Sequence, residues 1–129
     1  MEIRNEADGI SVVKKNRTEV NYFIFDEYDI ILNKIPSMSA QEWHKHEVID
    51  EVIVVTAGEI TVYWQENDNV KKQVLHKNAM VNVKKTIHTI KNESPCCAEF
   101  IVFRMVPSGE NKRTIITGDK TVYENMECQ

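Results

Sequence analysis

Residues 43–64 read WHKHEVIDEVIVVTAGEITVYW, and this stretch decides the fold. Two runs rich in β-branched and aromatic residues, 48–56 and 59–65, lie on either side of the pair Ala57-Gly58. Runs of this kind separated by a turn signal are typical of β-strands. A two-residue loop at Ala57-Gly58 predicts an antiparallel hairpin, because tight loops of this length join adjacent strands.

The register of this hairpin places a carboxylate on an apolar face. Glu51 would lie opposite Trp64, and their shared face would carry Glu51, Ile53, Val55, Ile60, Val62 and Trp64. A carboxylate among apolar side chains is costly unless it is paired or binds a metal ion, so Glu51 is expected to have a function. The alternative is an ordinary surface carboxylate, which requires a slip of the whole register. In that case Asp50 would replace Glu51 as a ligand.

Three of the four histidines form a spaced arrangement with Glu51. His44 and His46 are two positions apart, so on a strand both imidazoles point to the same side, and His88 comes from a later run. Three neutral imidazole nitrogens and one carboxylate oxygen suit a divalent first-row ion, namely Fe, Mn, Ni, Co, Cu or Zn. Such a ligand set leaves coordination positions open, as a catalytic site requires. The competing interpretation is three unrelated surface or half-buried histidines.

The spacing of these residues resembles the first conserved motif of the cupin superfamily, HxH(x)3–4E(x)6G, matched here from His44 to Gly58. His88 and Asn92 are similar to the Hx3N end of the second cupin motif. The resemblance covers residues 39–92. It implies a double-stranded β-helix, or jelly-roll, barrel whose metal ligands are His44, His46, Glu51 and His88. The glycine, proline and glycine that usually precede the second-motif histidine are replaced by Lys77, Val83 and Lys85. These replacements alter turn geometry and remove no ligand.

The rest of the chain also reads as short strands divided by polar turns. Further runs of strand-forming residues occur at 20–25, 28–35, 70–75, 79–83, 87–91 and 98–106. Regularly spaced short strands with no helical period between them predict an all-β sandwich or barrel. Residues 20–110 are assigned to the cupin barrel. Residues 1–19 are interpreted as an N-terminal arm or edge strand, and residues 111–129 as a segment that packs on the barrel or on a partner.

Composition limits the functions open to this chain. It has 129 residues, about one domain's worth, and a net charge of −4 without a basic stripe, so nucleic-acid binding is not expected. The N-terminus lacks the apolar segment of a signal peptide, and no apolar run is long enough to span a bilayer. We therefore expect a cytoplasmic protein with no membrane partner. Cys96, Cys97 and Cys128 have no disulfide or metal-binding spacing and are interpreted as free thiols.

Beyond the four ligands, the candidate pocket-lining residues are Trp64, Ile53, Val62 and Arg104. Arg104 lies on a run that is apolar on both faces, so it is either a buried clamp on an anion or the exposed end of a strand, and exposure is favoured. The other face of the predicted hairpin is too apolar to face water, since it carries Val52, Val54, Thr61 and Tyr63. A second sheet, the N-terminal arm or a partner subunit must cover it, and a homodimer is predicted.

Two functions fit these residues. The first is a metal-dependent enzyme whose bound ion polarises an oxygen of a small-molecule substrate, as the resemblance to isomerases, dioxygenases and decarboxylases among cupins implies. The second is a non-catalytic cupin that binds or senses a small molecule, since one fold hosts many functions. The sequence identifies no general base outside the ligand set.

Overall fold

The computed structural model of the chain describes residues 1–107 and 112–124 and confirms an all-β architecture. The strands are β1 (Ile10–Val13), β2 (Glu19–Ile24), β3 (Tyr28–Ile35), β4 (Ser39–Ala40), β5 (Trp43–Lys45), β6 (Asp50–Ala57), β7 (Glu59–Glu66), β8 (Asn69–His76), β9 (Met80–Asn82), β10 (His88–Asn92), β11 (Ala98–Met105) and β12 (Thr121–Tyr123). A 3-10 turn, η1 (Glu6–Asp8), precedes them, and a short helix, α1 (Lys112–Gly118), lies before β12. Each strand predicted between residues 20 and 106 has an observed counterpart. The sequence pattern did not indicate α1 or the short strands β4 and β12. It placed His44 and His46 on one strand, and the observed β5 contains His44 and ends just before His46.

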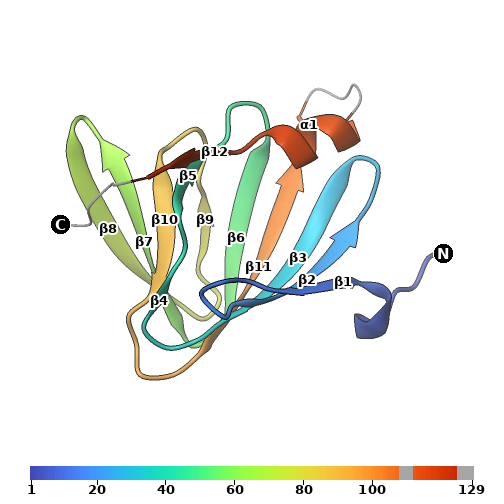
Figure 1. Ribbon diagram of the computed structural model, residues 1–129, viewed down its shortest axis with the longest axis horizontal. Coiled ribbons are helices and arrows are strands. Elements are labelled where there is room, and N and C mark those ends of the chain that lie inside the picture. The colour runs from blue at the N-terminus through green and yellow to red at the C-terminus, as the bar shows by residue number, and fades with distance from the viewer. Residues whose placement is uncertain (108–111, 125–129) are drawn as a thin grey trace.

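The strands form two antiparallel sheets that face each other (Figure 1). One sheet has the order β1-β2-β3-β11-β6-β9, and the other has the order β12-β5-β10-β7-β8, with β4 also paired to β10. The sheets do not close into a continuous barrel, but they enclose one core, which confirms the jelly-roll prediction. α1 and β12 lie across the same end of the two sheets, at the top of the view.

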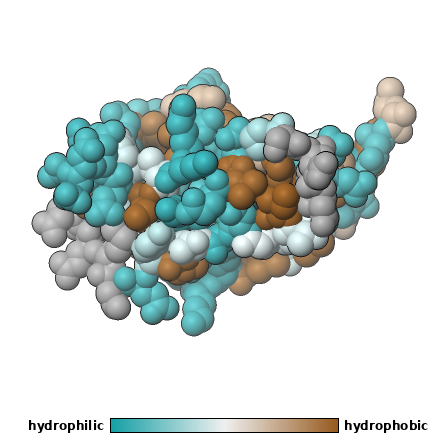
Figure 2. All heavy atoms as spheres, turned by 90° about the horizontal axis from the view of Figure 1, so that it is seen from above, coloured by the Kyte–Doolittle hydropathy of each residue, from teal (hydrophilic) through white to brown (hydrophobic). Residues whose placement is uncertain are grey.

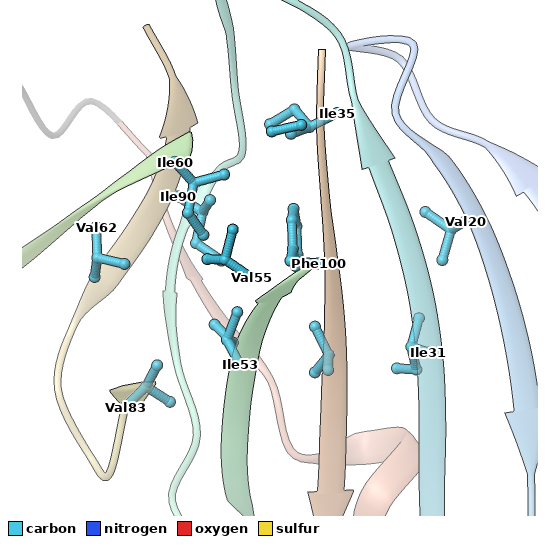
Figure 3. Close-up of a cluster of buried hydrophobic side chains, with 12 residues drawn as sticks. Val20, Ile31, Ile35, Ile53, Val55, Ile60, Val62, Val83, Ile90 and Phe100 are labelled. Carbon is cyan, nitrogen blue, oxygen red and sulfur yellow. The ribbon is translucent and has the colours of Figure 1, made fainter. Parts of the chain in front are cut away.

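The core lies between the two sheets (Figure 3). In β3 and β6, buried residues alternate with more exposed ones, as the period of two along a strand requires. The buried side chains of both sheets form one cluster: Val20, Ile31, Ile35, Ile53, Val55, Ile60, Val62, Val83, Ile90, Ala98, Phe100 and Val102. Fully burying a large apolar side chain contributes roughly 1.5–3 kcal/mol, so this cluster is the main force that holds β6 and β10 in place across the sandwich.

β6 and β7 do not form the predicted hairpin. β6 pairs with β11 and β9, whereas β7 pairs with β10 and β8 in the opposite sheet. Gly58 turns the chain from one sheet to the other with a φ of 70°, and a Cβ at this position would lie 2.9 Å from a backbone oxygen. Consequently Glu51 pairs with Arg104, and Trp64 pairs with His88, instead of with each other. The inward-facing side chains were nevertheless identified correctly, because two stacked strands turn their inner faces toward the same core.

Both ends of the described chain add a strand to a sheet edge. β1 pairs with β2, and β12 pairs with β5. Arg113 on α1 donates to both carboxylate oxygens of the buried Asp29, at 2.6 and 2.9 Å. The helix also joins a second small apolar cluster, made of Ile49, Val106, Ile115 and Ile116. Residues 112–124 therefore pack on the sandwich at the end where β6 begins and β11 stops.

Two sequence interpretations fall beyond the described residues: the domain boundary between residues 110 and 111, and the thiol of Cys128. Cys96 and Cys97 are exposed free thiols. Within residues 1–107 and 112–124, no helix has the length and apolar character needed to cross a bilayer.

Candidate metal centre

Four side chains from two separate stretches of the sequence meet at one end of the sandwich. His44 is on β5, His46 follows that strand, Glu51 is on β6 and His88 begins β10. A donor atom of each residue lies within 4.8 Å of those of the others. All four residues are buried, with exposed fractions of 4%, 1%, 3% and 0% in that order. The structure thus brings together the four residues that the sequence singled out as metal ligands.

Strand pairing explains how these side chains converge. His44 and His88 are direct neighbours on β5 and β10, with ring centroids 4.4 Å apart. His46 lies just beyond the end of β5, and its ring centroid is 5.2 Å from that of His44. Glu51 reaches the three imidazoles from the opposite sheet, because its position on β6 points inward. The site is therefore assembled across the gap between the sheets.

Each imidazole is held through its Nδ1 atom by a backbone carbonyl. The carbonyl oxygens that contact Nδ1 of His44, His88 and His46 belong, in that order, to Glu42 at 2.9 Å, Thr86 at 2.9 Å and Asp119. A carbonyl oxygen only accepts hydrogen bonds, so Nδ1 carries the proton in each neutral ring. In the neutral form of each ring the lone pair is then on Nε2, which is the form of histidine that binds a metal ion.

The Nε2 atoms of His46 and His88 lie against the carboxylate of Glu51. Nε2 of His46 lies 3.0 Å from Oε2 of Glu51, and Nε2 of His88 lies 3.8 Å from Oε1. Both Nε2 atoms are buried and have no hydrogen-bond partner. A buried polar atom without a hydrogen-bond partner is costly. A divalent cation among the four donors would bind both Nε2 atoms and remove this cost, so the residues present fit a metal ion.

The protonation states of this group also suit a cation. Burial, and then the nearby charge of His88, lower the pKa of the His44 imidazole from 6.5 to about 3, so His44 is neutral near pH 7. Burial by itself raises the pKa of the Glu51 carboxyl. Contacts with His46 and His88 and the charge of Arg104 outweigh burial and hold that pKa well below its ordinary value. A neutral imidazole beside an ionised carboxylate is what a divalent ion requires.

Arg104 contacts the ligand group directly. It lies opposite Glu51 on β11, and its Nε donates to Oε2 of Glu51 at 2.9 Å. Its side chain is 22% exposed and ion-paired, so the favoured sequence interpretation of a freely exposed Arg104 is wrong. The anion that it clamps is the glutamate of the site. The two residues are 53 positions apart, so no local sequence pattern predicts their contact.

Asp119 supports the site from the C-terminal segment, and sequence reasoning missed it. Its carboxylate accepts hydrogen bonds from the backbone N–H groups of Glu47, Val48 and Ile49, at 3.1, 2.7 and 2.8 Å. Burial raises the pKa of Asp119, but these N–H donors outweigh it and lower the pKa overall. Because its carbonyl oxygen also contacts His46, Asp119 ties the loop between His46 and Glu51 to the segment that precedes β12.

Two hollows flank the four candidate ligands. The larger has a volume of about 370 Å³, is lined mainly by apolar side chains and reaches one ligand, His88. The smaller has a volume of about 20 Å³ and reaches two ligands, His44 and Glu51. Viewed from above, over α1 and β12, hydrophilic residues cover most of this end of the molecule, with hydrophobic residues between them (Figure 2).

Three of the four residues expected to line a pocket lie on one of these two hollows. Trp64 and Val62 lie on the larger hollow, and Arg104 lies on the smaller one. Ile53 lines neither hollow, which corrects the sequence interpretation. Its side chain is 0% exposed because it points between the sheets and is packed on all sides within the core cluster.

The turns around the second cupin motif form without the usual glycines. Asn78 and Lys84 adopt the left-handed backbone conformation, with φ of 73° and 51°. The N–H of Lys84 is bound by the side chain of Asn82 at 3.0 Å. Asn92 stabilises the turn after β10, because its buried side chain accepts hydrogen bonds from the N–H and hydroxyl of Ser94. The replaced glycine and proline positions therefore leave His88 in place.

Comparison by sequence finds no relative: no protein-family model and no curated protein matches the chain. Solved structures are similar in fold. The capsular polysaccharide assembling protein CapF from Staphylococcus aureus superposes with a TM-score of 0.70 and 16% identity, over 88% of this chain and 33% of that one. Oxalate decarboxylase from Lactobacillus farciminis, in a formate complex, superposes with a TM-score of 0.67 and 13% identity, over 85% of this chain and 35% of that one.

A smaller neighbour matches along almost its whole length. It is the Cupin_2 domain of an XRE family transcriptional regulator from Enterobacter cloacae, with a TM-score of 0.59 and 18% identity, over 70% of this chain and 98% of that domain. This chain spans about a third of the length of CapF and of the oxalate decarboxylase. The paired sheets, the buried group of three histidines and one glutamate, and these neighbours agree that the chain has the cupin fold.

Proposed function

We propose that this protein is a metal-dependent enzyme that acts on an oxygen-bearing small molecule. The observation that supports this most strongly is the buried ligand group, in which two Nε2 atoms without partners face the oxygens of Glu51. Such an arrangement is costly in the metal-free chain and favourable around a divalent ion. A structural role alone would be served better by apolar residues of similar volume.

The residues of the chain have separate tasks in this proposal. His44, His46, Glu51 and His88 would hold an Fe, Mn, Ni, Co, Cu or Zn ion, with the three carbonyl contacts at Nδ1 fixing the orientation of the rings. When bound, the ion supplies Lewis-acid polarisation of a substrate oxygen. Arg104 holds the Glu51 carboxylate in place. The apolar hollow beside Trp64 and His88 would accommodate the carbon skeleton of the substrate.

The reaction proposed is of the isomerase, dioxygenase or decarboxylase type. One of the structural neighbours is an oxalate decarboxylase, which supports chemistry on small oxygen-rich molecules at this fold. Protein purified without chelators would be analysed for metal and then screened with sugars, keto acids and catechols for turnover and oxygen consumption. Turnover that depends on the metal would support the proposal, and stoichiometric metal without turnover would favour the alternative below.

The ligand assignment has its own matched test. His46→Ala should abolish bound metal because it removes one of the four ligands, whereas His76→Ala should leave the metal content unchanged. His76 is an exposed residue on β8 and is not part of the ligand group, so it controls for the loss of any histidine. Stoichiometric metal in His46→Ala would refute the ligand assignment.

The alternative function is a non-catalytic module that binds or senses a small molecule. Two observations favour it. The neighbour that matches over almost its full length is a domain of a transcriptional regulator. Among the described residues that line the two hollows, Glu51 is the one carboxylate, so no separate carboxylate base lies beside the substrate position. Saturable binding of a small molecule without chemical conversion would support this alternative.

We also propose that the protein forms homodimers in the cytoplasm. The outer face of the predicted hairpin divides between the two sheets. Thr61 and Tyr63 are buried within one chain, while Val52 and Val54 on the other sheet are half-buried. Exposed apolar residues of the β1–β3 sheet supply further surface for a partner: Ile10, Val12 and Leu32. Equilibrium sedimentation should give a dimer at micromolar concentration, and a monomer would refute this proposal.

A further inference from the structure

The smaller hollow beside the ligand group collects positive charge from three distant parts of the chain. Lys14 comes from the segment after β1, Arg104 from β11 and Lys120 from the residue before β12. His44 and Glu51 also line this hollow. Three cationic side chains therefore surround a space that directly adjoins two of the candidate metal ligands.

The carboxylates that contact these cations do not neutralise the charge of all three. Arg104 is bound to Glu51 at 2.9 Å, and Lys120 is bound to Glu42. Lys14 is half-buried, and among the described residues it has no ion-pair partner. A half-buried ammonium without a partner is costly, and a divalent ion in the site would add to the surplus of positive charge.

The surroundings of Lys14 reflect this surplus. Burial lowers the pKa of its ammonium group, and the charges of Lys120 and Arg104 lower it further, while Glu42 and Glu51 oppose them. Lys120 and Arg104, which line the same hollow, thus repel the Lys14 ammonium through space. An anion placed in the hollow would relieve this repulsion.

We propose that the smaller hollow is a subsite for the carboxylate group of a small-molecule substrate, with Lys14 as its ion-pair partner. This deepens the proposed function, since the carboxylate belongs to the molecule whose other oxygen lies at the metal ion. The volume of about 20 Å³ is close to that of one or two water-sized spheres, so it suits a carboxylate and not the larger phosphate group. The substrate class is therefore a small carboxylic acid.

The test compares Lys14→Met with Lys15→Met in zinc-loaded protein. Both substitutions remove one charge from neighbouring positions, but Lys15 is exposed and does not line the hollow. Formate is titrated by calorimetry, with formamide as its neutral counterpart of the same shape. We expect Lys14→Met to weaken formate binding about tenfold or more, as loss of a charge-assisted hydrogen bond predicts, and Lys15→Met to leave it unchanged.

The controls separate this inference from the proposed function. Zinc content and thermal unfolding are measured for each variant, and Lys14→Met should keep both. If the wild-type chain does not take up zinc, the same formate titrations are made on the metal-free protein. The ratio of formate affinities between Lys14→Met and Lys15→Met then still tests the subsite. Equal formate affinity in Lys14→Met and Lys15→Met would overturn the subsite, as would equal binding of formate and formamide. Tighter binding of inorganic phosphate than of formate would also overturn it.

Discussion

Asp119→Ala tests whether the C-terminal segment organises the metal centre. The substitution removes a carboxylate that accepts three backbone hydrogen bonds, from Glu47, Val48 and Ile49. The first two N–H groups are solvent-exposed and can bond to water, whereas the third is partly buried. A hydrogen bond to a charged group contributes about 1.5–3 kcal/mol. Since mainly the bond from Ile49 is lost without replacement by water, we expect the free energy of unfolding to fall by about 2 kcal/mol.

The larger effect is expected on metal affinity. The carbonyl oxygen of Asp119 holds Nδ1 of His46, so releasing the loop at residues 47–49 loosens the orientation of that imidazole. Removal of a group that orients a metal ligand typically weakens metal binding by about 10–100-fold. We expect a decrease in this range for Asp119→Ala and a smaller one for Asp119→Asn, which keeps a carbonyl acceptor.

Two measurements check these values. Zinc affinity is determined by competition with a chromophoric chelator, and the free energy of unfolding is determined by urea titration of the metal-free protein. Glu124→Ala, an exposed carboxylate in the same segment, is the control and should change neither quantity. If Asp119→Ala lowers stability but keeps zinc affinity within twofold of the wild type, Asp119 does not orient His46 and the reasoning fails.

Three further predictions concern the fold and its pH dependence. Gly58→Ala should lower the free energy of unfolding by more than about 1 kcal/mol, because φ is 70° and the added Cβ would lie 2.9 Å from a backbone oxygen. Gly118→Ala, where no atom lies within 4 Å, should cost nothing in the same urea titration. Arg113→Met should destabilise the protein by about 3 kcal/mol in thermal and urea unfolding, since it leaves the buried Asp29 charge without its partner, and a loss below 1 kcal/mol would contradict the role of this ion pair. The pKa of His44 is about 3 in the folded chain, compared with its ordinary value of 6.5. Between these two pH values the unfolded chain binds more protons than the folded chain. The metal-free protein therefore loses stability as the pH falls, by up to about 1.4 kcal/mol per pH unit. Urea titrations from pH 4 to 7 should show this slope, and His44→Gln should reduce it.

Strand positions and inward-facing residues were predictable from the sequence because both depend on local chemistry. β-branched and aromatic runs favour strands, and the period of two places Glu51, Ile53 and Val55 on one face whatever the strand pairs with. The ligand set was predictable for a related reason. A glutamate on an inward face, with His44 and His46 at fixed spacing and His88 in the matching motif, is a pattern recorded in the residues themselves.

Strand partners were not predictable in the same way. A tight turn at Gly58 is compatible with a hairpin and with a crossing from one sheet to the other, and the alternation of side chains is identical in both. The choice depends on which strands from the rest of the chain compete for the edges of β6. β11 and β9 take both edges, so β7 pairs elsewhere.

The surroundings of the ligands were decided by the tertiary structure alone. Arg104 meets Glu51 across 53 residues of sequence, and Asp119 meets His46 across 73. Lys14 and Lys120 come to the same hollow from opposite ends of the chain. No periodicity or spacing in the sequence predicts such contacts, because they form only when the sheets stack and the two terminal segments pack against the edges of those sheets. The sequence by itself determined which atoms could bind a metal ion, and the packing of the two sheets decided which charges surround them.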